Sequence, residues 1–368
     1  MRDRPLHVLF VNSQRSVGGG PSATADLATG LVRAGHAVTV VCHPDGDVRR
    51  RLVPVDRLAV VTLAMSRDFS PTMLRALRRV LRDAAPDVIL ANKRADVRST
   101  VLARGRARTP PIVHREGAPE PFKDHALHRW VWRRVQAMVL NSAAMRDRYR
   151  EERPWLAAVP MHVVHNGKDL SRYRPHPDRR EAMREALGLA RVAYVPCFHG
   201  QLYRRKRVDE MIRAAAPLVG RYPLQLLVVG EGEDRVPLQA LADALRVPVV
   251  FGGVRHDIAD VLAAADVAVN LATSEGFSNS VIEALACGVP VIATDDHSHG
   301  EQVQDGVTGR LVPPRDLSAL EAALAEFADP ARRAGAAIAA RADAEARFGL
   351  EAMVAGYVAV LTAVRSEK

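Results

Sequence analysis

The first half of the chain repeats one pattern, in which a short apolar run is followed by an amphipathic segment. The apolar runs predict strands at His7–Val11, Ala37–Val41, Leu58–Thr62, Val88–Ala91, Ile112–His114, Ala137–Leu140 and His162–Val164. The segments between them predict helices at Ser22–Ala34, Pro71–Asp83 and Pro121–Gln136. Buried strands that alternate with helices are typical of a parallel α/β sheet.

The same pattern starts again after the polar, proline-bearing stretch Tyr173–Asp178. Its strands are predicted at Ala193–Cys197, Leu224–Val229, Val247–Phe251, Val267–Asn270, Val289–Ala293 and Arg310–Val312. Its helices are predicted at Val208–Val219, Arg235–Leu245, Ile258–Ala263, Val281–Ala286 and within Ser318–Ala346. Two such series predict an α/β protein with two doubly wound, Rossmann-like domains that face a cleft, over residues 1–175 and 176–349.

Length and composition agree with two globular domains, because 368 residues exceed one typical core. No apolar run is long enough to span a bilayer, and the apolar piece of the N-terminal MRDRPLHVLFVNS reads as a first strand rather than a signal peptide. Cys42, Cys197 and Cys287 have no paired spacing. We therefore expect no disulfide framework, no zinc site and a cytoplasmic location.

Basic residues are concentrated in the first half of the chain. Residues 1–180 hold 33 Lys and Arg against 17 Asp and Glu, a net charge of +16, whereas the remainder carries −6. Such an asymmetry favours an anionic partner, or a peripheral contact with the inner face of a membrane. Met73–Arg82 and His128–Arg134 combine apolar or Trp side chains with Arg, as membrane-interfacial segments do, but packing on the core with Arg outward is the open alternative. No nucleic-acid-binding motif is present, so we expect no nucleic acid as partner.

The segment Ser274–Gly288 carries the most chemical information. Glu275 and Glu283 lie eight residues apart across a loop-to-helix junction, and the small polar residues Ser278–Ser280 are of the kind that open a helix. The first N–H groups of a helix have no internal partner and its dipole favours negative charge, so a helix start can hold a phosphate. A phosphate cradle beside two carboxylates that can accept hydrogen bonds from hydroxyls predicts a sugar-nucleotide site.

This segment resembles the E-x7-E signature of retaining glycosyltransferases, and of family 4 in particular. Further segments resemble the glycine-rich opening, the N-G-x-D segment, the phosphate loop and the D-G-x-T-G segment of that family, in the same order. They are Gly18–Gly20 with Gly35–Val38, His165–Asp169, Gly200–Arg207, and Asp305–Gly309 with Leu311–Pro314. The resemblance covers most of the chain and implies the GT-B fold. It also implies an acceptor-binding first domain, a donor-binding second domain and a C-terminal helix, here within 350–368, that crosses back to the first.

The resemblance implies roles for individual residues. Glu275 would contact the transferred sugar, Glu283 the ribose and Lys206 the diphosphate, whose departure builds up negative charge. Gln201 stands where the family has an Arg, so another arginine of the phosphate loop is expected to compensate. The donor-binding residues expected on this basis are Gly19, Gly20, Arg204, Arg205, Lys206, Gly253, Val254, Glu275, Gly276, Phe277, Ser278, Asn279, Ser280 and Glu283.

A segment of the first domain, Ile112–Gly117, resembles the family's V-x-T-x-H-G, which carries a His on the cleft wall. Glu116 occupies the position of that His, and His114 the position of the Thr. Both are candidate catalytic residues beside Glu275 and Lys206, but a buried histidine or a salt-bridged glutamate is an equally open interpretation.

We expect neither a metal nor another cofactor. The 13 histidines are scattered, and the neighbouring His297 and His299 lack carboxylate or Cys partners at ligand spacing. The family resembled works without a metal, with basic groups in its place.

The predicted function is transfer, with retention, of a hexose-type sugar from a UDP- or GDP-sugar to an acceptor hydroxyl. The acceptor is expected to be an envelope glycan, a lipid-linked saccharide or another anionic molecule. The resemblance implies that the leaving phosphate helps to deprotonate the acceptor on one face of the sugar. Two alternatives stay open: a nucleotide-sugar epimerase of the same architecture, and a non-catalytic nucleotide-sugar-binding subunit.

Overall fold

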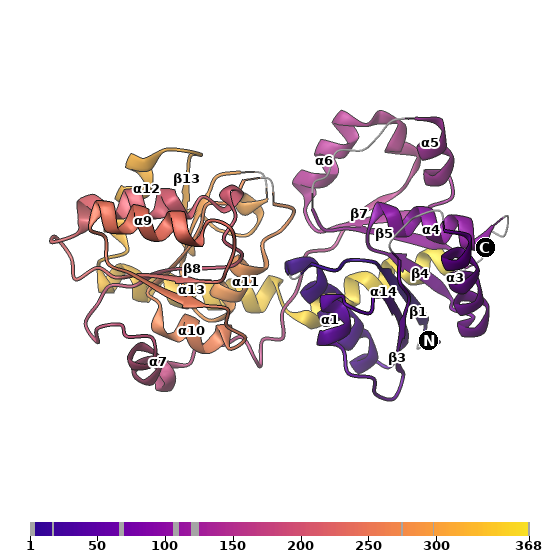
Figure 1. Cartoon of the computed structure of the whole chain (residues 1–368), viewed down its shortest axis with the longest axis horizontal. Helices are drawn as coiled ribbons and strands as arrows, with labels where there is room; N and C mark the ends of the chain where they lie inside the picture. The colour runs from indigo at the N-terminus through magenta and orange to yellow at the C-terminus, as the bar shows by residue number, and fades with distance from the viewer. Residues whose placement is uncertain are drawn as a thin grey trace. The chain divides into compact units, whose positions relative to one another are not determined.

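The computed structural model describes residues 4–16, 18–65, 70–105, 110–118, 125–273, 275–296 and 298–366 (Figure 1). The chain forms two compact units, one of Met1–Gly167 with Leu350–Lys368 and one of Lys168–Gly349. The division falls at Gly167 rather than at residue 175, because Leu170 and Tyr173 already pack on the core of the second unit.

The first unit is built on a parallel sheet of seven strands in the order β3-β2-β1-β4-β5-β6-β7. The strands are β1 (His7–Asn12), β2 (Ala37–Cys42), β3 (Leu58–Thr62), β4 (Val88–Ala91), β5 (Ile112–Glu116), β6 (Ala137–Leu140) and β7 (Met161–Val163). The four central strands β1, β4, β5 and β6 are buried almost throughout. Continuous apolar runs form such strands because helices cover both faces of the sheet.

The helices of the first unit come from both ends of the chain. They are α1 (Gly19–Arg33), α2 (Asp47–Arg51), α3 (Pro71–Ala84), α4 (Arg94–Arg104), α5 (Ala126–Trp132), α6 (Ala143–Glu152), the 3₁₀ helix η1 (Pro154–Ala158) and α14 (Leu350–Ser366). Side chains of α1 and α14 pack on one face of the sheet, and those of α3 and α4 on the other. Of the helix predicted over 121–136, residues 121–124 lie outside the described residues.

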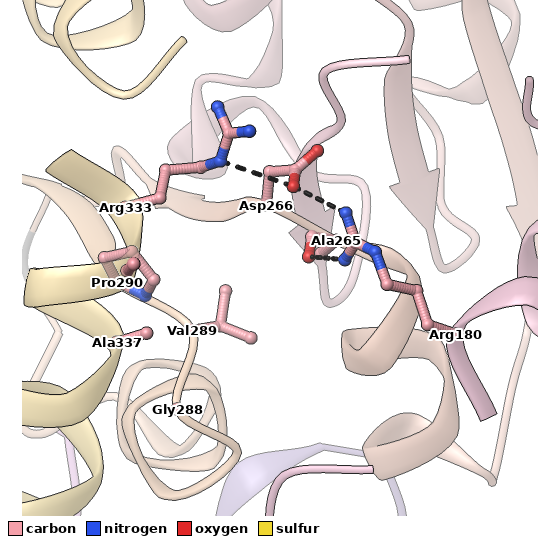
Figure 2. Close-up of a pocket in the computed structure, with 9 residues that line it drawn as sticks. Arg180, Ala265, Asp266, Gly288, Val289, Pro290, Arg333 and Ala337 are labelled. Atoms are coloured by element: carbon pink, nitrogen blue, oxygen red, sulfur yellow. Dashed lines mark hydrogen bonds and ion pairs between the residues drawn. The ribbon is translucent and has the colours of Figure 1, made fainter. Parts of the chain in front are cut away.

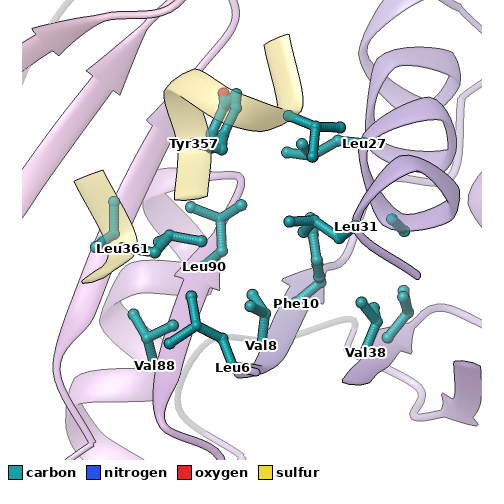
Figure 3. Close-up of a cluster of buried hydrophobic side chains, with 14 of the residues drawn as sticks. Leu6, Val8, Phe10, Leu27, Leu31, Val38, Val88, Leu90, Tyr357 and Leu361 are labelled. Atoms are coloured by element: carbon teal, nitrogen blue, oxygen red, sulfur yellow. The ribbon is translucent and has the colours of Figure 1, made fainter. Parts of the chain in front are cut away.

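The last helix is an integral part of the first unit. Tyr357 of α14 faces Leu27 of α1, Leu31 of α1 lies over Phe10 of β1, and Leu361 of α14 lies beside Leu90 of β4 (Figure 3). Each of these side chains is at most 1% exposed. Leu27 and Leu31 are four residues apart and therefore lie on one face of α1. Full burial of an aliphatic or aromatic side chain stabilises the folded state by about 1.5–3 kcal/mol, so the first core depends on the C-terminal helix.

The second unit has a parallel sheet of six strands in the order β10-β9-β8-β11-β12-β13. The strands are β8 (Pro196–His199), β9 (Leu226–Val229), β10 (Val249–Gly253), β11 (Val267–Asn270), β12 (Val291–Thr294) and β13 (Gly309–Val312). The two sheets confirm the predicted pair of parallel α/β domains.

Helices also cover both faces of the second sheet. They are η2 (Pro177–Arg179), α7 (Arg180–Ala186), η3 (Arg204–Lys206), α8 (Val208–Ala215), η4 (Ala216–Leu218), α9 (Arg235–Leu245), α10 (Ile258–Ala264), α11 (Asn279–Ala286), η5 (His299–Glu301), α12 (Leu317–Glu326) and α13 (Pro330–Arg347). Helices α8, α9 and α12 pack on one face, and α10, α11 and α13 on the other. Asp316 and Asp329 start α12 and α13 by accepting hydrogen bonds from first-turn amides.

Each sheet reverses its strand order at one point, between β1 and β4 in the first unit and between β8 and β11 in the second. In open parallel sheets, ligands bind outside the carboxyl ends of the strands at such a reversal. In the second sheet, β8 ends there at His199 and β11 at Asn270.

Candidate active site

Glu283 lies in the second turn of α11, beside the strand reversal of the second sheet. Its Oε1 is 2.9 Å from Nζ of Lys168, and its Oε2 is 3.3 Å from Nε2 of His199. Burial by itself would raise the pKa of Glu283, but the Lys168 ammonium and the His199 hydrogen bond outweigh it and lower the pKa to about 2. Glu283 is therefore an ionised carboxylate at neutral pH, and it can only accept hydrogen bonds.

Glu275 precedes the same helix and pairs with a cation of the phosphate loop. Nζ of Lys206, at the end of η3, contacts Oε1 of Glu275, and both side chains are nearly buried. Burial would raise the pKa of Glu275, but the charge of Lys206 outweighs it and lowers the pKa. Arg204 and Arg205 are both exposed, but a guanidinium nitrogen of Arg205 is 4.0 Å from the same oxygen of Glu275. Of the two arginines considered as a substitute for the family Arg, Arg205 is the better placed.

The start of α11 is held by two buried amide side chains. Asn270 donates from Nδ2 to the hydroxyls of Ser278 (2.8 Å) and Ser280 (2.9 Å). Gln302 accepts from the Ser278 amide (3.0 Å) and donates to the Ser278 carbonyl (2.8 Å). The Ser278 N–H, which was expected to be available to phosphate, is therefore already used. A phosphate at this helix would be held by amides further along the first turn, from Asn279 onward.

Other expected donor-binding residues differ in what they can offer. Gly276 is buried beside Phe277, whose ring packs edge-on against Phe348 with centroids 5.7 Å apart. The Phe277 side chain therefore belongs to the core, and contact with a donor would involve backbone only. Gly253 ends β10, its carbonyl accepts from the Gly230 amide at 2.7 Å, and Val254 after it is exposed.

His299 of η5 is a residue of this region that the sequence did not single out as a site residue. Its Nδ1 is 3.0 Å from the carbonyl of Thr294, which assigns the proton to Nδ1. Its Nε2 is buried without a hydrogen-bond partner among the described residues. Burial lowers the pKa of His299, although the nearby charge of Glu275 opposes this. The imidazole is therefore neutral at pH 7, with an unused lone pair on Nε2.

Sequence reasoning missed Lys168, His199, Asn270 and Gln302 as site residues. His199 and Asn270 are the last residues of β8 and β11, so the rule on strand reversals could have singled them out. Lys168 is one of only five lysines among 52 basic residues, which is a weak signal. Gln302 gives no sequence signal that we can identify.

The two catalytic candidates of the first unit belong to one buried ionic group. Strand β5 continues through Glu116 instead of ending at His114, and both side chains are buried. Glu116 Oε2 is 2.9 Å from Nη2 of Arg94 and 3.3 Å from Nε2 of His114, whose Nδ1 is 3.0 Å from the carbonyl of Ala91. Burial would raise the pKa of Glu116, but His114 and Arg94 lower it. The geometry agrees with the salt-bridged interpretation, and a catalytic role for either residue stays a prediction.

The glycine-rich segment adopts helical rather than loop structure. Helix α1 begins at Gly19, so Gly19 and Gly20 form its first turn, whereas the sequence predicted a helix start near Ser22. A Cβ at Gly20 would lie 3.1 Å from Oε1 of Gln14, so the Gln14 side chain would have to shift slightly to accommodate it. The turn follows β1 at the reversal of the first sheet, where helix amides favour an anion.

The two basic segments pack as ordinary core-facing helices. The apolar side chains of α3 lie in the core while its arginines face outward; the buried ones are Met73, Leu77 and Leu81. Trp132 of α5 is also buried, and Trp130 is 39% exposed beneath the guanidinium of Arg134. The apolar stripe of α3 is thus not available for insertion into a bilayer. Among the described helices, none has the length and apolarity needed to cross a membrane.

A cavity of about 180 Å³ lies at the opposite edge of the second sheet, where β11 and β12 begin. Figure 2 shows Asp266 there between Arg180 and Arg333, at 2.6 and 3.4 Å, and Arg184 contacts its other oxygen at 2.9 Å. The three arginines form ion pairs with Asp266 directly before β11. The lining of the cavity includes neither Glu275 nor Glu283, so the cavity is separate from the signature carboxylates.

Within the part of the chain that the structure describes, no three His, Cys, Asp or Glu side chains gather as metal ligands would. His297, considered above as a possible ligand, lies outside the described residues.

Two parallel α/β units, with the two E-x7-E carboxylates at a strand reversal, define the GT-B class of glycosyltransferases. Residues 17–172 match the family described as Glycosyltransferase Family 4, and residues 193–329 match Glycosyl transferases group 1. The chain belongs to glycosyltransferase family 4.

Relatives and solved structures agree with this assignment. D-inositol 3-phosphate glycosyltransferase of Mycolicibacterium smegmatis is 31% identical over 77% of this chain and 64% of its own length. The protein of the same name from Streptomyces scabiei is 36% identical over 55% of this chain and 48% of its own length. The chain thus spans about half to two thirds of the length of these relatives.

Two solved structures show the same fold. Anabaena HepE, in complex with UDP and glucose, has a TM-score of 0.80 at 23% identity, and the match covers 97% of this chain and 100% of that one. Sucrose-phosphate synthase of Thermosynechococcus elongatus has a TM-score of 0.84 at 20% identity, over 98% of this chain and 100% of that one.

Proposed function

We propose that this protein is a retaining glycosyltransferase that moves a hexose-type sugar from a UDP- or GDP-sugar to an acceptor hydroxyl. The observation that carries the proposal is the pairing of each signature carboxylate with a lysine at the strand reversal of the second unit. Glu283 would accept hydrogen bonds from the ribose, and Glu275 from the transferred sugar. The HepE structure holds UDP and glucose, which supports a UDP-sugar as the first donor to test.

In the proposed reaction, the bond between C1 of the sugar and the diphosphate oxygen breaks while the acceptor oxygen bonds to C1 on the same face. The acceptor proton passes to the leaving diphosphate. Lys206 and Arg205 would stabilise the charge that accumulates on that diphosphate, which is the task that fixed cations perform best in a site shielded from water. With these cations in place, the proposal includes no metal or other cofactor.

The acceptor is proposed to be a sugar phosphate, a lipid-linked saccharide or another anionic glycan in the cytoplasm or at the inner membrane surface. Its support is the net charge of +16 over residues 1–180 and the exposed arginine face of α3. The name of the inositol-phosphate relatives also indicates an anionic acceptor for those proteins. Replacing Arg75, Arg78, Arg79 and Arg82 by Gln should weaken acceptor binding in a salt-dependent way. Unchanged acceptor and liposome binding in this variant would exclude the basic face.

The first experiment is a thermal-shift panel of UDP-, GDP-, ADP- and dTDP-sugars on the wild type, Glu283→Ala and Glu185→Ala. A ligand that binds only the folded state adds about 2.7 kcal/mol of stability at a hundredfold excess over its Kd. We expect stabilisation by one nucleotide class that Glu283→Ala loses. Glu185 is exposed on α7, so its variant should respond as the wild type does. The absence of any response would contradict the donor site.

NMR of the reaction then separates the catalytic alternatives. A glycosyltransferase forms a product with the anomeric configuration of the donor only when an acceptor is present. An epimerase would convert the donor alone, and a non-catalytic subunit would bind the donor without turnover across an acceptor panel. Inversion of the anomeric centre would refute the retaining assignment.

A further inference from the structure

Lys168 is the most deeply buried cation near the signature carboxylates. It is 1% exposed, and its Nζ is 2.9 Å from Oε1 of Glu283. Removing an ammonium group from water is costly, and an apolar side chain of similar volume often stabilises a protein as well as a buried ion pair does. A lysine at this position is therefore poorly explained by packing alone.

The backbone of Lys168 lies at the place where the chain passes from one unit to the other. The chain crosses once between Gly167 and Lys168 and again between Gly349 and Leu350. The Lys168 amide donates to the carbonyl of Phe348 at 2.8 Å, and Lys168 forms a parallel bridge with Gly349. The two crossings are thus hydrogen-bonded side by side, and the Lys168 side chain reaches from them to Glu283.

The two contacts of Glu283 leave part of its hydrogen-bond acceptor capacity for a ligand. Lys168 binds one carboxylate oxygen and His199 the other, so the two contacts fix both the position and the rotation of the group. Each oxygen has a further lone pair, and together they can accept from two neighbouring hydroxyls.

We propose that Lys168 is a positioning residue of the nucleotide site, which orients the Glu283 carboxylate toward the ribose hydroxyls and fastens it to the chain crossing. The identity of the ligand as a nucleotide rests on the proposed function, whereas the orientation of the Glu283 carboxylate by Lys168 does not.

A consequence concerns pH. Among the described residues, the charged or titratable groups near Glu283 are Lys168 from the crossing, His199 from the end of β8 and the Cys287 thiol directly after α11. In Lys168→Met, the largest influence that lowers the pKa of Glu283 would be gone and the His199 contact would remain, so the pKa of Glu283 should rise from about 2. In this variant, ribose recognition would be lost as the pH falls through the raised pKa of Glu283. In the wild type, Glu283 stays ionised from pH 5 to 8, so its contribution to nucleotide binding should not change over this range.

The test compares the full-length wild type with Lys168→Met, Lys168→Arg and Arg172→Met. Arg172 is an exposed cation of the same segment whose guanidinium donates to the His256 carbonyl, so it is a matched control. Calorimetry would measure the Kd of UDP and 2′-deoxy-UDP, and of GDP and 2′-deoxy-GDP, at several pH values. NMR titration of ¹³C-labelled Glu would measure the pKa of Glu283, identified by its loss in Glu283→Gln.

We expect the wild type to prefer the ribonucleotide by at least about tenfold, since hydrogen bonds to charged groups are the strong ones. Lys168→Met should lose most of this preference and gain a pH dependence, Lys168→Arg should recover part of it, and Arg172→Met should match the wild type. A wild-type preference retained by Lys168→Met, or an unchanged Glu283 pKa, overturns the positioning role while leaving the proposed function intact. Failure of the wild type to bind any of the four nucleotides overturns the nucleotide site itself, and with it the proposed role of Lys168.

Discussion

The Lys206–Glu275 pair allows a quantitative test of the site in the absence of any substrate. In Lys206→Met, the Glu275 carboxylate stays nearly buried, and Arg205, 4.0 Å away, is the cation that remains beside it among the described residues. Breaking a buried ion pair by removing one partner costs about 3–5 kcal/mol. Because the two side chains keep 12–13% of their surface exposed, we take the lower end, about 3 kcal/mol, for Lys206→Met and for Glu275→Gln.

Removing both charges should cost less than removing either, because no unpaired charge remains. The double variant Lys206→Met/Glu275→Gln is therefore expected to be more stable than each single variant. Hydrogen exchange of the most protected amides of β8 and β11 measures this locally, which matters because a chain of two units need not unfold in one step. A loss of 3 kcal/mol corresponds to roughly hundredfold faster exchange.

A surface pair of the same unit is the control. Arg221 and Glu321 are 3.8 Å apart, with 60% and 34% of their side-chain surface exposed, so Arg221→Met should cost less than about 1 kcal/mol. Single-variant losses at Lys206 and Glu275 no larger than this control, or losses that simply add in the double variant, would refute the claim that the two charges depend on each other.

Three further predictions concern pH, the last helix and a tautomer. Glu283 has a pKa of about 2 in the folded state against an ordinary value of 4.5, so it should contribute about 3 kcal/mol of stability above pH 4.5. That contribution is lost as the pH falls from 4.5 to 2, and the difference between the unfolding curves of wild type and Glu283→Gln should show this slope. Leu361→Ala, on the buried face of α14, should destabilise the first unit by about 2–5 kcal/mol, while amide exchange in the second unit stays unchanged. ¹⁵N NMR should find His299 neutral at pH 7 with its proton on Nδ1. A proton on Nε2 alone would contradict the assigned hydrogen bond to Thr294, and a charged ring would contradict the lowering of the His299 pKa by burial.

The sheets could be predicted because their strands are apolar on both faces, which leaves continuous runs in the sequence. Helix α4 could not, since it buries Arg94 and Asp96 together with Val97 and Val101, and these polar residues mask the apolar period. Helix α6 is likewise highly polar, with only Met145 of its apolar residues fully buried beside Tyr149.

The site was predictable only as far as its residues are close in sequence. Glu275 and Glu283 lie in one segment, and the phosphate loop around Lys206 is recognisable by itself. The partners of Glu283, in contrast, come from the chain crossing and from the end of another strand, and no local pattern joins Lys168 or His199 to α11. The contact of Gln302 with Ser278 is also a tertiary contact, and its side chain could not be distinguished in the sequence from that of any polar loop residue.

The position of α14 in the chain has a consequence for how the protein is made. A ribosome delivers residues 1–167 first, yet Leu27, Leu31 and Phe10 keep an uncovered apolar surface until Leu350–Ser366 have been synthesised. Lys168–Gly349 is continuous and can finish folding as soon as it has emerged. The amino-terminal unit is therefore completed last, and during that delay its exposed core is the part of the nascent chain most prone to aggregate or to need a chaperone.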